Sequence, residues 1–194
     1  MDEIVTAFHN RLLQSCSYLI ARRDCCWLVD CGDAEPIKDR LTGNALALKG
    51  IFLTHCHHDH VYGLNDILDL NPHVPVFCSK LTAMGLGDAK MNLSYITPEY
   101  PFAFKYEQNV HILCQGKREV AGLQIEALST PGHSDDCMTY IVGNNIFTGD
   151  SYIPFARVFT KWPRSDKRLA FENEHKLKEI ILKNKLNVYC GHWQ

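Results

Sequence analysis

The sequence predicts an α+β fold in which two packed sheets are flanked by helices. Short apolar runs typical of strands recur in both halves of the 194-residue chain, and each half is followed by a helical pattern. The second of these patterns spans 166–184. It is charged on one side and carries apolar residues at near-helical spacing, as expected of an amphipathic helix that covers a sheet.

The first half begins with two strands and a hairpin turn at Arg22-Arg23-Asp24. Further along, Leu64, Ile67 and Leu68 recur at helical spacing until Asn71-Pro72 ends the helix, so the residues just before Leu64 lie at its amino end. The strands expected in this half are 17–21, 25–29, 50–54 and 75–79.

The second half repeats the alternation of strands and turns. The stretch 82–101 carries Met, Gly and Pro with little periodicity, and it is either a substrate-facing loop or an ordinary connecting loop with a short helix. The strands expected after it are 111–114, 123–129, 138–142 and 145–148.

One motif concentrates metal-ligand side chains directly after the apolar strand that ends near Leu53. It reads Thr54-His55-Cys56-His57-His58-Asp59-His60, the pattern HxHxDH. Imidazole nitrogens suit zinc, iron and related metals, and a carboxylate adds an oxygen ligand that can also accept a proton. The motif therefore predicts a hydrolytic metal site rather than a purely structural one.

Three later turns supply further ligands, because each places one ligand-type side chain after a strand-like run and a glycine. They are Gly132-His133, Gly149-Asp150 and Gly191-His192. A single such dipeptide is weak evidence for a metal site. Together with HxHxDH they form a strong pattern.

With these motifs the chain resembles the metallo-β-lactamase superfamily, specifically its glyoxalase II-like hydrolase branch. The stretches around Ser17-Tyr18-Leu19-Ile20 and Leu28-Val29-Asp30-Cys31-Gly32-Asp33 are similar to the same family. The resemblance implies the four-layer αββα sandwich of that family. It also implies one metal held by His55, His57 and His133, a second held by Asp59, His60 and His192, and Asp150 as the bridge between them.

The resemblance further implies a dinuclear hydrolase with two divalent metal ions, most simply zinc, with iron or manganese as alternatives. The two ions would share a hydroxide that Asp59, the catalytic residue, orients. The expected substrate is a small ester, thioester, lactone or phosphodiester. Glyoxalase II enzymes continue into a helical domain that binds glutathione, whereas only Trp193 and Gln194 follow His192 here, so the glutathione thioester is not the expected substrate.

Two other functions stay open at this point. A mononuclear iron oxidoreductase similar to persulfide dioxygenases would use His57, His133 and Asp150, and its metal content and sulfite production would distinguish it. A metal-binding module without catalysis is the third hypothesis. Antibiotic hydrolysis is disfavoured, because secreted β-lactamases of the superfamily commonly carry a cysteine where Asp150 stands.

Some residues near the ligands are expected to play no part in the chemistry. His58 either supports the ligands from beside them or is simply exposed, and exposure is the expected role. Asp135 and Asp136, in the segment that reads GHSDD where relatives often read GHTPG, either tune the site or are exposed loop residues, and exposure is again expected. Cys56 and Cys190 are expected to act as small apolar packing residues. The basic residues Lys161, Arg164, Lys167 and Arg168 are expected in a solvated loop and helix start.

Composition agrees with a single hydrolase domain spanning 1–194 that acts on a small molecule. A formal net charge of −2 gives no support to nucleic-acid binding. The amino terminus lacks the features of a signal peptide and no run could cross a bilayer, so a cytoplasmic protein is expected. The nine cysteines are odd in number and form no CxxC, which predicts reduced thiols. Composition leaves the oligomeric state open.

Overall fold

Two mixed β-sheets form the centre of the computed structural model, which describes residues 3–193. In spatial order the first sheet contains β1 (Ile4–His9), β2 (Cys16–Arg22), β3 (Cys25–Val29), β4 (Ala47–Phe52), β5 (Val76–Cys78) and β6 (Val110–Ile112). The second contains β11 (Asn187–Cys190), β10 (Asn145–Gly149), β9 (Met138–Val142), β8 (Leu123–Ser129) and β7 (Gly116–Val120). The pairs β3-β4, β4-β5, β5-β6 and β10-β11 are parallel, and the others are antiparallel.

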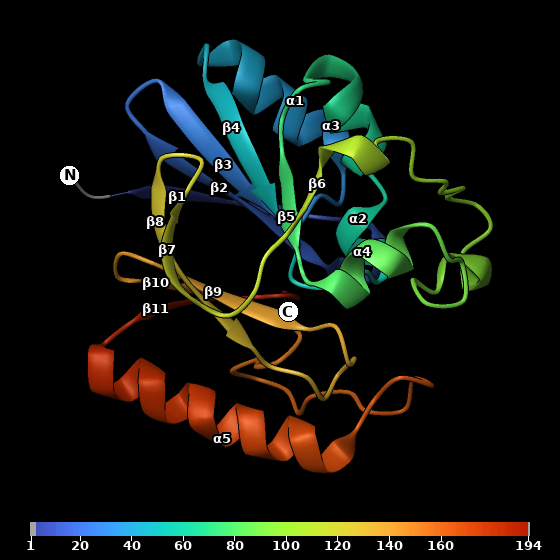
Figure 1. Cartoon of the computed structure of the whole chain (residues 1–194), viewed down its shortest axis with the longest axis vertical. Helices are drawn as coiled ribbons and strands as arrows, with labels where there is room; N and C mark the ends of the chain where they lie inside the picture. Colours follow the sequence, from blue (N-terminus) through green and yellow to red (C-terminus); the bar gives the residue numbers. More distant parts are fainter. Residues whose placement is uncertain (1–2, 194) are drawn as a thin grey trace.

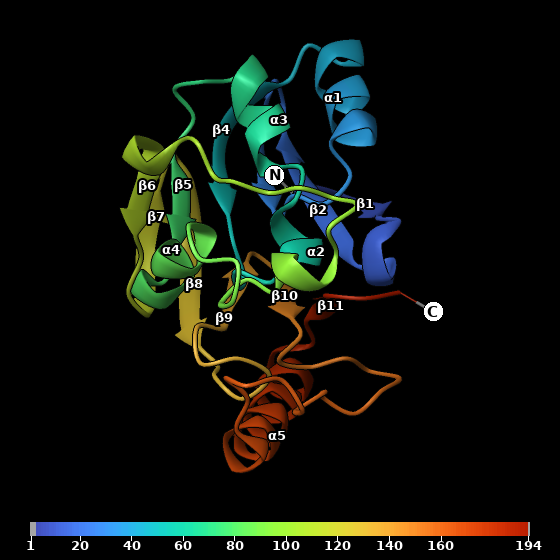
Figure 2. The ribbon, with the colours of Figure 1, turned by 90° about the vertical axis from the view of Figure 1, so that its right-hand side faces the viewer.

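Helices cover the outer side of each sheet (Figures 1 and 2). The helices α1 (Ala34–Gly43) and α3 (Leu64–Leu70) lie beside the first sheet, and α5 (Lys167–Asn184) lies along the second. The layers therefore follow the order helix, sheet, sheet, helix. This confirms the predicted αββα sandwich. No helix within 3–193 is long and apolar enough to cross a membrane.

Successive side chains along the strands of the first sheet point to opposite faces, so the sheet contributes to two hydrophobic cores, an outer core under the helices and an inner core between the sheets. In β2, Leu19 packs under the helices, whereas its neighbours Tyr18 and Ile20 face the second sheet. Phe52 belongs to the inner core, where its ring lies 5.4 Å from that of Tyr140 of β9. The inner core thus fixes the two sheets against each other.

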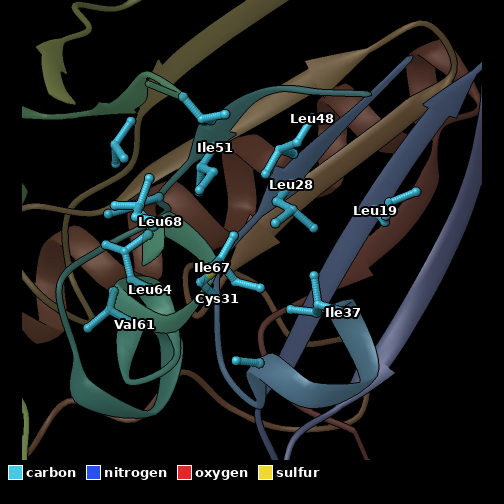
Figure 3. Packing of buried hydrophobic residues seen from close by; sticks show 14 of the residues in the cluster. Leu19, Leu28, Cys31, Ile37, Leu48, Ile51, Val61, Leu64, Ile67 and Leu68 are labelled. Atoms are coloured by element: carbon cyan, nitrogen blue, oxygen red, sulfur yellow. The ribbon is translucent and has the colours of Figure 1, made fainter. Parts of the chain in front are cut away.

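The outer core joins the first sheet to its helices (Figure 3). Ile37 of α1 and Leu64, Ile67 and Leu68 of α3 are fully buried there. Burying such a side chain stabilises the fold by roughly 1.5–3 kcal/mol relative to leaving it exposed. This packing holds the segment between β4 and α3, which carries the HxHxDH motif, against the sheet.

The motif departs from the prediction in one respect. The predicted single helix is divided into α2 (His58–Val61) and α3, so Asp59 and His60 lie within a separate short helix rather than at the amino end of α3. The division falls at Gly63, where any Cβ would overlap the backbone oxygen of Gly32. This close approach requires glycine and locks the motif against the end of β3.

The segment 82–101 contains a short helix, which agrees with the prediction of a connecting loop with a short helix. The helix α4 (Lys80–Leu86) overlaps its beginning, and a 3₁₀ turn, η2 (Ser94–Ile96), lies near its end. Two further 3₁₀ turns, η1 (Leu12–Gln14) and η3 (Glu107–Asn109), connect strands.

Candidate metal centre

Four strand ends bring the predicted ligands together at one end of the sandwich. The segments after β4, β8, β10 and β11 carry the HxHxDH motif, His133, Asp150 and His192 respectively. Backbone hydrogen bonds tie these segments to one another: Met138 N donates to Thr54 O at 2.7 Å, and Gly191 N donates to Gly149 O at 2.8 Å. The ligand-bearing loops are therefore held by the sheets.

The first group contains His55, His57 and His133, whose candidate ligand atoms lie within 4.8 Å of one another. His57 Nδ1 is 2.9 Å from His133 Nε2. The other ring nitrogen of His133, Nδ1, lies 2.9 Å from the Phe159 carbonyl oxygen, which accepts its proton. That hydrogen bond turns Nε2 of His133 toward the group.

The second group contains Asp59, His60 and His192, again with ligand atoms within 4.8 Å. Asp59 Oδ2 lies 3.5 Å from Nε2 of both histidines. His192 Nδ1 lies 2.9 Å from the Leu13 carbonyl oxygen, and this hydrogen bond directs the other ring nitrogen, Nε2, toward the group. Trp193 stacks on His9 at 4.8 Å and helps to fix the segment that carries His192.

Asp150 lies between the two groups. Its Oδ2 is 3.3 Å from His133 Nε2 and 3.1 Å from His192 Nε2, and its Oδ1 is 3.4 Å from His60 Nε2. One carboxylate therefore contacts a histidine of the first group and both histidines of the second. This is the position that a bridging ligand requires.

Gly191 makes this arrangement possible. A Cβ at this position would overlap Asp150 Oδ1 and would lie 3.0 Å from His60 Cε1. The glycine before the last histidine is thus needed for the close approach of the backbone to the carboxylate.

Unpaired buried atoms show that these residues fit metal ions. Within the described part of the chain, His55 Nε2, His60 Nε2 and Asp150 Oδ1 are buried and have no hydrogen-bond partner. Leaving such a group unsatisfied costs about 1–3 kcal/mol each. All three face the cluster, where a bound cation would satisfy them.

The charge states of the first group also suit metal binding. Burial lowers the pKa of His55 well below its ordinary value and lowers that of His57 to about 4. Both imidazoles are therefore neutral near pH 7, which is the form that binds a metal. Burial opposes ionisation of Asp150, but attraction to His133, His192 and His60 outweighs it and holds the pKa of this carboxyl well below its ordinary value.

Asp30, at the end of β3, orients the cluster and was not predicted as a site residue. Its Oδ2 accepts hydrogen bonds from His60 Nδ1 at 2.9 Å and Thr54 Oγ1 at 2.8 Å, and its Oδ1 accepts one from Thr54 N. The bond to His60 leaves Nε2 of that ring free to face the cluster. The available signal was a carboxylate directly after an apolar strand, which alone is too common to indicate this role.

Three expectations about neighbouring residues are wrong. His58 is buried and its Nδ1 is bonded to Thr97 Oγ1, because α2 turns it into the fold. Asp136 is buried and accepts a hydrogen bond from the Cys56 backbone N–H at 2.8 Å, which fixes the loop that carries the motif. Arg164 is largely buried, since it pairs with Asp135 and lies 3.5 Å from Cys56 Sγ.

The remaining neighbours agree with expectation. The Asp135 side chain is about half exposed, and Cys56 is fully buried. Cys190 is half-buried. Burial raises the pKa of the Cys56 thiol above its ordinary value. A protonated buried thiol acts as a packing residue.

The sequence model of the metallo-beta-lactamase superfamily matches residues 10–192 of this chain. The chain belongs to this superfamily. The predicted family resemblance is thereby confirmed. A superfamily relative, the hydroxyacylglutathione hydrolase of Hahella chejuensis (strain KCTC 2396), is 32% identical over 171 residues. That match covers 86% of this chain and 56% of the relative, so the chain spans little more than half the length of the curated relatives it matches.

Two solved structures share the fold of this chain. The BLEG-1 B3 metallo-beta-lactamase is 23% identical with a TM-score of 0.84, and the match covers 98% of this chain and 92% of that chain. TTHA1623, solved in a di-iron-bound form, is 24% identical with a TM-score of 0.81, covering 97% and 92%. These likenesses support the αββα architecture.

Proposed function

We propose that this chain is a dinuclear metal-dependent hydrolase that cleaves a small ester, thioester, lactone or phosphodiester. The observation that carries the proposal is the pair of ligand groups joined by Asp150. The hydroxyacylglutathione hydrolases among its relatives support the hydrolase class. The iron alternative, which uses only His57, His133 and Asp150, leaves the second group without a role.

Metal ions bound there would supply a hydroxide nucleophile near neutral pH and would stabilise negative charge on the substrate oxygen. The residues of the chain position the reaction. Asp59 lines the pocket above the cluster and has an Oδ2 directed at His60 and His192, so it can accept and hold a proton beside the reacting centre. Asp30 and the Leu13 and Phe159 carbonyls hold His60, His192 and His133 in fixed orientations.

We further propose zinc as the metal and the cytoplasm as the compartment. Five imidazoles and two carboxylates are ligands that zinc accepts readily, although iron and manganese share them. All nine cysteines are free thiols, which fits a reducing compartment.

The test is a panel of ester, thioester, lactone and phosphodiester substrates assayed with zinc-loaded protein, before and after a chelator. Hydrolysis should require the metal. Asp150→Ala should lower kcat/KM by more than the roughly 10–100-fold typical of residues that only orient ligands. The matched control is Asp39→Ala, on the exposed side of α1, which should retain wild-type activity. Undiminished turnover in Asp150→Ala would refute the proposal.

A further inference from the structure

A pocket of about 320 Å³ opens directly above the proposed ligands. Its floor contains His57, Asp59, His133, Asp150 and His192. Its walls are mostly apolar and come from three segments far apart in the sequence, within 12–13, 93–97 and 153–162. A concave apolar site with a few convergent polar groups is typical of a small-molecule site.

The wall exposes large apolar side chains that could otherwise be buried. Leu13, Ile96, Phe155 and Phe159 are exposed by 57%, 41%, 45% and 46% respectively, and all four line this pocket. Contiguous apolar surface of this kind is uncommon on a protein and often marks a ligand-binding groove.

Each wall segment is hydrogen-bonded to a histidine of the motif or the floor. The Leu13 carbonyl oxygen pairs with His192 Nδ1 and the Phe159 carbonyl oxygen with His133 Nδ1, both at 2.9 Å. The third segment is joined through Thr97 Oγ1 to Nδ1 of His58. The apolar wall is therefore fixed relative to the reacting centre.

Backbone conformation supports the same conclusion. Leu13 and Leu93, on two different wall segments, have φ values of 51° and 64°. This left-handed region is uncommon for residues other than glycine, asparagine and aspartate, and such strain clusters at ligand sites. The fold thus holds two leucines on the wall in unfavourable conformations.

We propose that this pocket binds an apolar acyl group, so that the enzyme prefers thioesters or esters of unsubstituted medium-length carboxylic acids over those of hydroxy acids. The inference rests on the proposed hydrolase function. In the reaction, water adds its hydroxyl to the acyl carbon, the acyl–sulfur or acyl–oxygen bond breaks, and the leaving group departs with the proton. A volume of about 320 Å³ lies at the lower end of the roughly 300–1,000 Å³ typical of small-molecule sites, which fits the reacting carbonyl with an acyl chain of about six carbons rather than a long one.

The test uses zinc-loaded protein and N-acetylcysteamine thioesters of acetate, butanoate, hexanoate, decanoate and lactate, which share one small leaving group. Burying one methylene corresponds to about a fourfold gain, so kcat/KM should rise about fourfold per added methylene up to hexanoate. It should then fall at decanoate. The lactate thioester should be a poorer substrate than the butanoate thioester. Calorimetry should show hexanoate binding more tightly than acetate.

Matched variants locate the effect. Phe155→Ser should flatten the dependence on chain length while preserving hydrolysis of the acetate thioester, because Phe155 lines the wall and is not bonded to a proposed ligand. Phe171→Ser is the control, because Phe171 lies on α5, is 73% exposed and does not line the pocket. It should leave the dependence unchanged. Circular dichroism verifies that both variants are folded.

Two results would overturn the inference while the hydrolase function stands. One is turnover of these thioesters with no dependence on chain length. The other is an unaltered dependence in a folded Phe155→Ser variant. Failure to hydrolyse any of these thioesters at full metal occupancy also overturns it, and the wider substrate panel then decides the proposed function independently.

Discussion

Asp150 contacts histidines of both ligand groups, and the residues around it explain how one carboxylate can do so. Gly191 provides the space beside its Oδ1, and Asp30 turns His60 toward it. Neither residue would bind a metal in the proposed arrangement. Their effects on the site are therefore separable from the loss of a ligand.

Substitution of Gly191 by alanine tests the close approach. The added Cβ would overlap Asp150 Oδ1, so the carboxylate must move away from its histidines. We expect Gly191→Ala to lose at least one metal ion per chain and to lower kcat/KM by about 100-fold or more, beyond the usual effect of an orienting residue. Elemental analysis and kinetics measure both quantities.

The matched control is Gly87→Ala, because a Cβ at Gly87 meets no atom within 4 Å. It should bind metal and turn over as the wild type does. Full metal occupancy in Gly191→Ala would show that Asp150 can move without loss of the site, and the bridging position would have to be reconsidered.

Asp30→Asn tests the orientation of His60. The amide keeps the size of the carboxylate but cannot match its charge-assisted bond to His60 Nδ1. We expect metal affinity at the second group to fall by about 10–100-fold, with a smaller effect on the first. A chelator competition titration resolves the two affinities. Wild-type affinity at both groups would show that the Asp30 contact does not tune the metals.

At the scale of residues, the positions of the proposed ligands could be predicted where several ligand-type side chains share a motif. The seven proposed ligands lie together because four strand-to-turn segments carry them, and strand and turn signals are local. Asp30, Asp136 and His58 were missed or misjudged. They are buried because they form hydrogen bonds with Thr54, Cys56 and Thr97 respectively. Hydrogen bonds between residues far apart in the sequence produce no periodic pattern from which they could be predicted.

Among the secondary-structure elements, the buried strands were predicted closely. The bounds of β3, β8 and β9 agree with expectation. The strands β1 and β7 were not predicted, because both are edge strands and β7 is rich in charge, which weakens the apolar signal. The helix α1 was also missed. It is short, with only three buried residues, so its helical period is hard to recognise.

The amino end of α1 provides a test at the level of elements. Asp33, which precedes the helix, accepts hydrogen bonds from the backbone and side chain of Arg11, and it links α1 to the β1–β2 connection. Burial alone would raise the pKa of Asp33, but the bonds from Arg11 outweigh it and lower the pKa below 3.8. The ionised form is therefore stabilised by folding.

The sign of the pH dependence follows. A carboxyl whose pKa is depressed in the folded state contributes stability above its unfolded pKa, and that stability is lost as pH falls through the folded pKa. Because Arg11 is mostly exposed, we expect Asp33→Asn to cost only about 1 kcal/mol at pH 6. The difference from wild type should shrink as the pH falls below 3.8 and should vanish only below the lower pKa that Asp33 has in the folded state. Urea unfolding at several pH values measures it, and a constant difference down to pH 2 would contradict the account.

For the molecule as a whole, the site lies at the end of the sandwich where loops from both sheets meet. The inner core holds the sheets together, and the outer core holds the motif segment in place. The αββα architecture was named from family resemblance, since strand and helix patterns alone do not specify how sheets stack. That 1–194 forms a single domain stays a prediction, as does the absence of a nucleic-acid partner.

The metal content of the whole chain tests the central claim most directly. Protein prepared with ample zinc and manganese, then freed of unbound metal, should contain close to two transition-metal ions per chain by elemental analysis. His192→Ala should retain one, because it removes a ligand of the second group only. One iron ion per chain and no second metal would contradict the dinuclear account and favour the mononuclear iron oxidoreductase.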